Sequence, residues 1–180
     1  IREVNLKNLL GNDNINFPYI INIDFIKKIF SNKPTICFQK IAKKPLVGMV
    51  NGLYATSNGT GGLSLIEVMK VPTDKTLGLE LTGQQGDVMK ESIQCAKTIA
   101  WNLIPENIKN NICDSLKNNS YGIHIHCPEA ATPKDGPSAG TAITLTILSL
   151  LTNSKIKNNI AVTGEINLNG EVLAVGGIDL

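Results

Sequence analysis

From position 46 onward the hydrophobic residues follow two periods, one typical of strands and the other typical of helices. Apolar runs at 46–54 and 63–71 flank the segment 57–62, whose sequence Ser-Asn-Gly-Thr-Gly-Gly favours a tight turn. We therefore predict a β-hairpin at this point, with a further short strand at 77–81. Residues 122–127 alternate between apolar and polar positions and also predict a strand.

Three segments have the spacing of helices. Apolar side chains recur at alternating intervals of four and three residues along 87–103, which predicts a helix. Pro105 ends that helix, and residues 106–116 predict a shorter one. The apolar stretch 141–151 is long enough for three turns of a buried helix.

Toward the C-terminus, residues 160–168 and 171–175 flank Asn169-Gly170, which is the strongest short hairpin signal in the chain. Together these elements predict a mixed α/β fold rather than a strict alternation of strands and helices. The first 45 residues have a weaker pattern. Residues 1–11 resemble the end of a helix, and the Asn- and Lys-rich segment 12–45 is interpreted as a linker with one amphipathic helix at 24–30.

Composition excludes several classes of protein. A chain of 180 residues with a formal net charge of +2, and without basic runs beside aromatics, gives no indication of nucleic-acid binding. No apolar stretch reaches the length of a membrane span, and no signal peptide opens the sequence. The cysteines have no short paired spacing, so we expect neither a disulfide framework nor a metal site, and a reducing compartment is favoured. They are Cys37, Cys95, Cys113 and Cys127.

The segment 132–140, Thr-Pro-Lys-Asp-Gly-Pro-Ser-Ala-Gly, places a serine just before a predicted helix. Gly136 and Pro137 form a tight corner in front of Ser138. Backbone N–H groups at a helix start are unpaired, so they are able to bind a developing oxyanion beside a hydroxyl nucleophile. Local physics alone favours a simpler role, because a serine before a helix is most often an N-cap.

Segment 132–140 resembles the serine signature of the Lon family of ATP-dependent proteases, with Ser138 at the position of the nucleophile. Other blocks match in the same order, and the resemblance covers about residues 46–180. These blocks are Val47-Gly48, Gly52-Leu53, Leu81-Thr82-Gly83 with Gly86, Val88-Met89 and Glu91-Ser92, Gly122 to Glu129, Thr163-Gly164-Glu165-Ile166, and Gly170 to Ile178. The resemblance implies the Lon protease-domain fold, which is related to the second domain of ribosomal protein S5.

The resemblance also implies a serine endopeptidase that degrades unfolded or damaged proteins with the help of an ATPase module. Residues 1–11 would be the end of that module, 12–45 the linker, and 46–180 the proteolytic domain, truncated at its C-terminus. No loop of the type G-x-x-x-x-G-K-[ST] occurs in the sequence, so ATP and Mg²⁺ would bind the absent ATPase module and this domain would need no cofactor. The expected partners are unfolded proteins, the ATPase module and other copies in a six-membered ring, without nucleic acid or membrane.

The general base of the family is a lysine in a Ser-Lys dyad, four residues after the second glycine of a Gly-Gly pair. Here the pair is Gly176-Gly177, so the lysine is expected directly after Leu180, and the 180 residues alone are expected to be inactive. Such a lysine must be neutral to accept a proton, so burial must lower its pKa from about 10.4 toward 7 or 8. Lys134 is near Ser138 in the sequence but occupies a different position in the family pattern.

Several residues are expected to support the nucleophile. Thr163 and Glu165 alternate onto one face of the strand predicted at 160–168; the resemblance makes Thr163 a hydrogen-bond partner of the lysine amine and Glu165 a nearby charge. An ordinary polar strand face is the alternative for Glu165. Asp135 either shapes the approach to Ser138 or is a turn aspartate bonded to its own backbone. In the family pattern Pro137 and Ala139 flank the nucleophile.

A His126-Asp135-Ser138 triad is the second candidate for the catalytic chemistry. It has the right residue types within this sequence, but the family does not use these histidines as the base. His124 and His126 share one strand face, where both are otherwise explained as polar groups near the cleft. The same pair could begin a metal site, but no convincing third ligand follows.

The alternative from another functional class is a ring-forming or regulatory module that keeps the fold without proteolysis. The family and the reduced cysteines indicate the mitochondrial matrix or a bacterial cytoplasm, and the linker composition favours the mitochondrial matrix. In the first hairpin, Ala55 stands where family members often have tryptophan, so cleavage preference does not carry over to this chain.

Overall fold

The computed structural model describes residues 20–31, 43–57, 59–129 and 132–179. The chain divides into two compact units, 1–38 and 39–180. In the first unit, helix α2 spans Ile23–Ile29, and the Asn22 side chain caps it by accepting the N–H of Phe25 at 2.8 Å. The helix predicted at 24–30 is thereby confirmed, whereas the helix end predicted at 1–11 lies outside the described residues.

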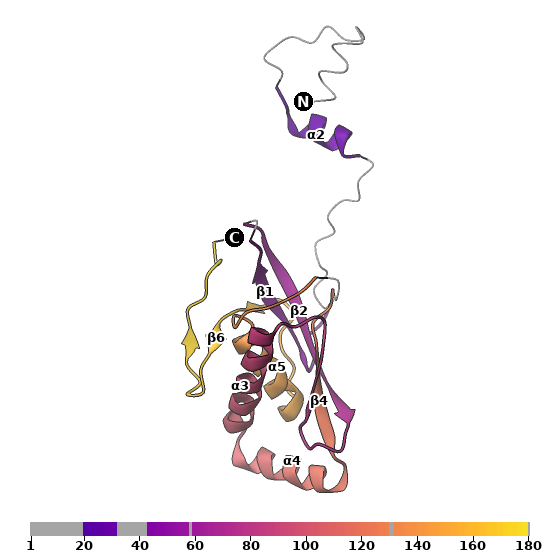
Figure 1. The fold of residues 1–180 in the computed structure, drawn as a ribbon. Helices are drawn as coiled ribbons and strands as arrows, with labels where there is room; N and C mark the ends of the chain where they lie inside the picture. The colour runs from indigo at the N-terminus through magenta and orange to yellow at the C-terminus, as the bar shows by residue number, and fades with distance from the viewer. Residues whose placement is uncertain (1–19, 32–42, 58, 130–131, 180) are drawn as a thin grey trace. The chain divides into compact units, whose positions relative to one another are not determined.

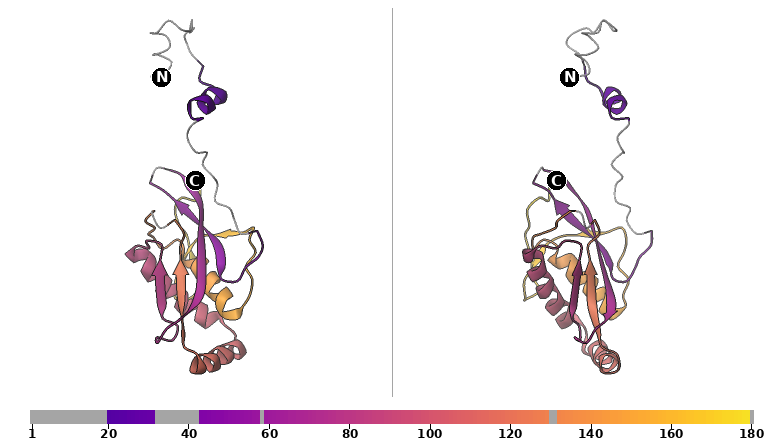
Figure 2. Two further views of the ribbon diagram at one scale, coloured as in Figure 1. Left: turned by 90° about the vertical axis from the view of Figure 1, so that its right-hand side faces the viewer. Right: turned by 45° about the vertical axis from the view of Figure 1, so that its right-hand side comes forward.

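A five-stranded mixed sheet forms the centre of the second unit, with the order β3-β4-β2-β1-β5 (Figures 1 and 2). The strands are β1 (Met49–Ala55), β2 (Gly61–Pro72), β3 (Leu79–Thr82), β4 (Tyr121–His126) and β5 (Ala161–Val162). β1 and β2 form the predicted antiparallel hairpin, and β2 pairs antiparallel with β4. β3 pairs parallel with β4, and β5 pairs parallel with β1.

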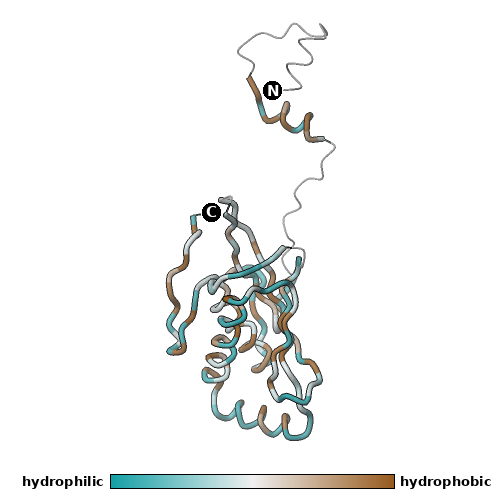
Figure 3. The backbone as a smooth tube through the Cα atoms, viewed as in Figure 1, coloured by the Kyte–Doolittle hydropathy of each residue, from teal (hydrophilic) through white to brown (hydrophobic). Residues whose placement is uncertain are grey.

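Two helices, α3 (Asp87–Leu103) and α5 (Gly140–Thr152), pack against one face of this sheet, and α4 (Glu106–Asn118) follows α3 (Figure 1). Figure 2 shows the strands in front of the helices when the sheet faces the viewer. Isoleucine is the commonest residue in the core between the sheet and the helices, which includes Ile66, Ile93, Ile123, Ile125, Ile143 and Ile147. Hydrophobic and hydrophilic segments alternate along α3 and α4 in Figure 3, as expected of helices with one buried side.

Periodicity predicted most of these elements well, but one strand was wrong. The helix predicted at 87–103 has these bounds in the structure, and the segment predicted at 160–168 is divided between two sheets. β5 ends at Val162, and β6 (Glu165–Ile166) pairs with β7 (Val172–Leu173) in a separate two-stranded sheet. The break lies at Gly164, whose φ of 147° is a conformation that side-chain-bearing residues rarely adopt.

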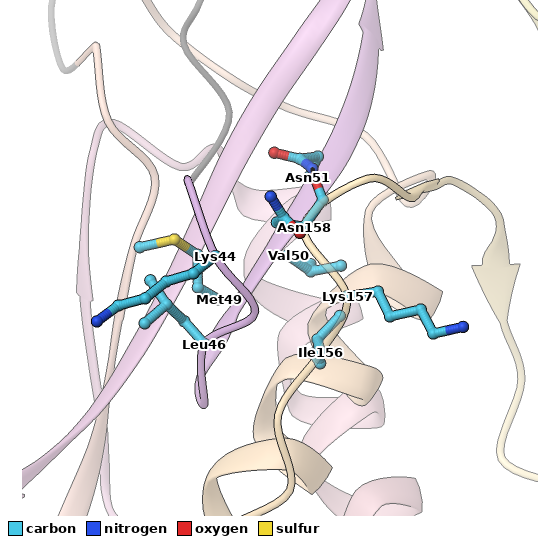
Figure 4. Close-up of a pocket in the computed structure, with 8 residues that line it drawn as sticks. All are labelled: Lys44, Leu46, Met49, Val50, Asn51, Ile156, Lys157 and Asn158. Atoms are coloured by element: carbon cyan, nitrogen blue, oxygen red, sulfur yellow. Dashed lines mark hydrogen bonds between the residues drawn. The ribbon is translucent and has the colours of Figure 1, made fainter.

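The segment that leads into β5 is fixed beside β1 by a buried asparagine. Asn51 Nδ2 donates hydrogen bonds to the carbonyl oxygens of Asn158, at 3.1 Å, and Ile160, at 2.9 Å. Figure 4 shows Asn51 and Asn158 beside a cavity of about 10 Å³, a volume that suits one water molecule. These bonds place β5, and with it the turn that follows, next to the hairpin of β1 and β2.

Buried polar and sulfur groups complete the packing. The Ser149 hydroxyl, on α5, accepts the N–H of Gly48 at 3.0 Å and donates to the carbonyl oxygen of Ser154. Among the described residues all cysteines are free, and Cys37 lies outside them. Burial raises the pKa of the Cys127 thiol, which belongs to the hydrophobic core. None of the helices in the described segments is long and apolar enough to cross a membrane.

We expect Ser149→Ala to lower the free energy of unfolding by about 1 to 3 kcal/mol, because it leaves a buried N–H and a carbonyl without their partner. Ser154→Ala is the matched control, since that exposed side chain makes only a 3.4 Å bond to the carbonyl of Thr152. Urea unfolding measures both changes. Equal effects of the two substitutions would show that the two hydrogen bonds of Ser149 make no special contribution to the free energy of unfolding.

Candidate active site

Ser138 is half-buried in the turn that precedes α5, and its hydroxyl is not used to cap that helix. The N-cap position belongs to Ala139, which has helical backbone angles of φ −83° and ψ −6°. Within the described residues no hydrogen bond involves Ser138 Oγ. The N-cap interpretation of Ser138 is therefore wrong, and the hydroxyl is available for another role.

The turn at Thr163-Gly164 holds the main chain of Ser138. The carbonyl oxygen of Ser138 accepts the N–H of Gly164 at 2.8 Å and the hydroxyl of Thr163 at 3.2 Å. In return, the carbonyl oxygen of Gly164 accepts the N–H of Thr141 at 3.0 Å and its hydroxyl at 2.9 Å. We name these four bonds the 138–164 clamp. They explain why the strand predicted at 160–168 is interrupted, because its central backbone groups bond to the start of α5 instead of to a strand.

Two main-chain donors lie beside the free hydroxyl. The N–H groups of Ser138 and Ala139 have no acceptor among the described residues, whereas the N–H of Gly140 donates to the carbonyl of Pro137 at 3.0 Å. Both free N–H groups are at the positive end of α5. Paired donors of this kind, next to a nucleophile, are what stabilises a tetrahedral oxyanion in acyl transfer.

Asp135 contacts a different helix. Its Oδ1 accepts the N–H of Met89, in the first turn of α3, at 2.9 Å and the N–H of Gly136 at 2.9 Å. The second bond agrees with the prediction of a turn aspartate, whereas the first bond was not predicted. The Lys134 amine donates to the carbonyl oxygens of Glu129, at 2.9 Å, and Thr132, at 3.1 Å, so it is engaged within its own loop.

The two histidines share one partner on the open face of the sheet. The Thr82 hydroxyl lies 2.9 Å from His124 Nε2 and 2.7 Å from His126 Nδ1, as the pairing of β3 with β4 dictates. No hydrogen bond joins His126 to Asp135 or Ser138 in the described part of the chain. Asp135 and His126 thus have partners outside the predicted triad. The described residues also contain no group of three or more His, Cys, Asp or Glu side chains that could hold a metal ion.

Ser138 opens into a cleft of about 350 Å³ between the β1–β2 hairpin and the C-terminal segment. The walls come from Leu53–Ala55, Gly61–Leu63, Thr163 and Gly176–Ile178. None of these lining residues is charged. The Gly176-Gly177 pair therefore lies in the wall of the cleft into which Ser138 opens.

The cleft also exposes a strand edge that sequence analysis missed. β5 pairs with β1 only at Asn51 and Gly52, because the chain turns away after Val162 to form the 138–164 clamp. Beyond Gly52, no other described strand pairs with β1 on the side opposite β2. Residues 53–55 thus combine a free backbone edge with a place in the cleft wall. No local sequence pattern predicts such an edge, because it depends on the residue at which β5 ends.

Comparison with known proteins gives one family. Residues 21–179 match the model of the Lon protease (S16) C-terminal proteolytic domain. The chain is 40% identical over 183 residues to a Lon protease homolog of Acanthamoeba polyphaga mimivirus, an alignment covering 99% of this chain and 18% of that protein. It is 39% identical over 169 residues to the Lon protease of Methanosphaera stadtmanae, covering 92% of this chain and 19% of that protein. With the Campylobacter jejuni Lon protease it shares 44% identity over 156 residues, 83% of this chain and 19% of that protein.

The chain thus spans about a fifth of the length of the curated relatives that it matches. These relatives come from a virus, an archaeon and a bacterium. They give no support to the mitochondrial matrix as a location, although a bacterial cytoplasm is consistent with them.

We expect Gly164→Ala to lower the free energy of unfolding by about 2 to 5 kcal/mol, the sum of backbone strain and overpacking. A Cβ at this position would lie 2.6 Å from Val172 Cγ1 and 3.0 Å from Thr141 Oγ1. Gly170→Ala is the control, because its φ is also positive, at 83°, but no atom lies within 4 Å. It should cost only about 1 to 2 kcal/mol.

Hydrogen exchange gives the local readout of the same pair. The Thr141 amide should exchange faster in the Gly164→Ala variant and remain protected in the Gly170→Ala variant. Unchanged protection of Thr141 in both would show that the 138–164 clamp does not depend on Gly164.

Proposed function

Because the chain belongs to the family of Lon protease (S16) C-terminal proteolytic domains, we propose that it cleaves peptide bonds with Ser138 as the nucleophile. One observation carries this proposal. The Ser138 hydroxyl is free of described hydrogen bonds, opens into a cleft and lies beside the unpaired N–H groups of Ser138 and Ala139. This is the arrangement that acyl transfer requires.

In the proposed reaction, Ser138 Oγ attacks the carbonyl carbon of the scissile bond and transfers its proton to a neutral lysine amine. The N–H groups of Ser138 and Ala139 stabilise the resulting oxyanion, and a single such donor is often worth about 3 to 4 kcal/mol. The lysine then gives the proton to the leaving amine, which departs and leaves an ester on Ser138. A water molecule, deprotonated by the same lysine, hydrolyses this ester.

The lysine of this Ser-Lys dyad is proposed to come from the segment that follows Gly176-Gly177. Support comes from the cleft, in which Gly176 and Gly177 lie with Ser138 and Thr163. The Thr163 hydroxyl donates to the carbonyl of Ser138, so its oxygen can accept an N–H of the lysine. Thr163 would therefore orient the base and hold the nucleophile at once. Lys134 is not proposed as the base because its amine bonds to carbonyls of its own loop.

The proposed substrate is an unfolded polypeptide in an extended conformation. Such a chain can pair with the free edge of β1 at Leu53–Ala55, which adds a strand to the sheet and brings a peptide carbonyl toward Ser138. The uncharged walls of the cleft favour apolar side chains next to the scissile bond. Supply of unfolded substrate by an ATPase module that binds ATP and Mg²⁺, and assembly into a six-membered ring, are parts of the same proposal for the complete protein.

Ser138→Ala in the complete protein should reduce cleavage of casein-like unfolded substrates to background, because it removes the attacking oxygen, and the Thr163 hydroxyl that also lines the cleft donates to the carbonyl of Ser138. Ser154→Ala, at an exposed serine, is the control and should cleave normally. Peptide release measured by fluorescence distinguishes the two. Undiminished cleavage by Ser138→Ala would remove the proposed nucleophile.

His126→Ala should lower kcat only modestly, since the imidazole bonds to Thr82 and not to the nucleophile. If His126 were instead the base of a triad, kcat would fall by about 10⁴-fold. Steady-state kinetics on one fluorogenic peptide separates these outcomes.

A further inference from the structure

We propose that Asp135 is a positioning residue: it caps helix α3 from outside that helix, and in doing so fixes the Ser138 turn relative to α3. The proposal rests on the proposed function, in which Ser138 must be held in place. It assigns Asp135 a role distinct from that of base or nucleophile.

The first turn of α3 receives its cap from a distant residue. Its N-cap residue is Gly86, which has no side chain to accept an orphan N–H group. The N–H of Met89, three residues further on, is the group that an N-cap side chain normally satisfies. Asp135 Oδ1 accepts it at 2.9 Å, across a sequence separation of 46 residues.

The space around Gly86 shows that the carboxylate replaces a local cap. A Cβ built on Gly86 would lie 2.3 Å from Asp135 Cγ and 2.6 Å from each carboxylate oxygen. The side chain of any other residue would collide with the carboxylate, so Gly86 and Asp135 form a matched pair. Removing the side chain of Asp135 frees the volume in which an ordinary N-cap side chain could stand.

Main-chain bonds join the same two segments. The N–H of Gly86 donates to the carbonyl of Lys134 at 2.7 Å, and the N–H of Lys134 donates to the carbonyl of Gln84 at 3.0 Å. Further along the turn, the Ser92 hydroxyl donates to the carbonyl of Pro137 at 3.3 Å. The Ser138 turn is therefore attached to α3 on one side and to Gly164 on the other.

Helix α3 is held in a fixed position because its inner side is part of the core, so a bond to α3 also fixes the Ser138 turn. Met89, Ile93 and Ala96 are at most 5% exposed, so the helix cannot shift without disturbing the packing. Asp135 is three residues before Ser138, and its two hydrogen bonds fix the backbone at the corner. Losing them removes the side-chain bonds at this corner. The turn is then held by the main-chain bonds of Lys134, by the Ser92 bond to Pro137 and by the 138–164 clamp, with more freedom in the direction of the Ser138 hydroxyl.

The first test compares Asp135→Ala and Asp135→Asn in the complete protein, with a short fluorogenic peptide as substrate. Asparagine caps helices as well as aspartate does, so Asp135→Asn should keep kcat within about threefold. Asp135→Ala should lower kcat by about 10- to 100-fold, the scale expected from small misplacement of a catalytic group, with KM changed less than about twofold. Asp87→Asn is the matched control, because it removes an exposed charge from the same helix end without touching the turn, and should leave both constants unchanged.

The second test separates capping from positioning. In Asp135→Ala combined with Gly86→Ser, the new serine can cap α3 locally but provides no connection to the turn. We expect the melting temperature and the exchange protection of the Met89 amide to recover in this double variant, while kcat stays low. If Asp135→Ala alone does not fold, this double variant still gives the kinetic result.

Three results would overturn the proposal: normal kcat in Asp135→Ala, recovery of kcat together with the melting temperature in the double variant, or equal losses in Asp135→Asn and Asp135→Ala. The last result would mean that the negative charge itself takes part in the chemistry. Cleavage by the Ser138→Ala variant tests the proposed function independently of this proposal. If that function is wrong, Ser138→Ala still cleaves the substrate, whatever the effect of substitutions at Asp135.

Discussion

The carbonyl oxygen of Ser138 accepts hydrogen bonds from Gly164 and Thr163, and this interaction decides which groups of the site remain free. A serine just before a helix usually turns its hydroxyl onto the helix backbone. Here the carbonyl of Ser138 bonds to the neighbouring Thr163-Gly164 turn, and the N-cap of α5 is Ala139 instead of Ser138. As a result, neither the Ser138 hydroxyl nor the N–H groups of Ser138 and Ala139 have a described partner. The same interaction ends β5 at Val162 and leaves the edge of β1 open beside the cleft. The proposed nucleophile, the proposed oxyanion donors and the proposed substrate edge thus all depend on one contact.

The site has three structural supports that lie far apart in the sequence. α3 holds the corner before Ser138 through Asp135, the Thr163-Gly164 turn holds Ser138 itself, and Asn51 fixes the segment leading to that turn. The core of isoleucines beneath them keeps the helices and the sheet in register. Because every support is a hydrogen bond between elements that are packed on this core, the geometry of Ser138 is set by the fold rather than by its own loop.

Periodicity in the sequence predicted the elements whose form is determined locally. The helix at 87–103 follows from its apolar spacing, and the hairpin at Asn169-Gly170 follows from turn chemistry. The strand predicted at 160–168 was wrong because alternating residues look the same in one long strand and in two short ones. What divides it is a set of bonds between residues about 25 positions apart, which no local pattern contains. Ser138 was predicted as the nucleophile from its family signature, and that role stays a prediction. The contact of Asp135 with α3 was missed; its one trace in the sequence is a glycine at the position where a capping side chain belongs.

The most direct test of the account is the crystal structure of the complete protein after reaction with a peptide boronate, which forms a tetrahedral adduct with an activated serine. We expect boron bonded to Ser138 Oγ, with one boronate oxygen within hydrogen-bond distance of the N–H of Ser138 or Ala139. The peptide should run along the edge of β1 at Leu53–Ala55. An adduct on another residue, or a boronate oxygen facing away from both N–H groups, would contradict the account.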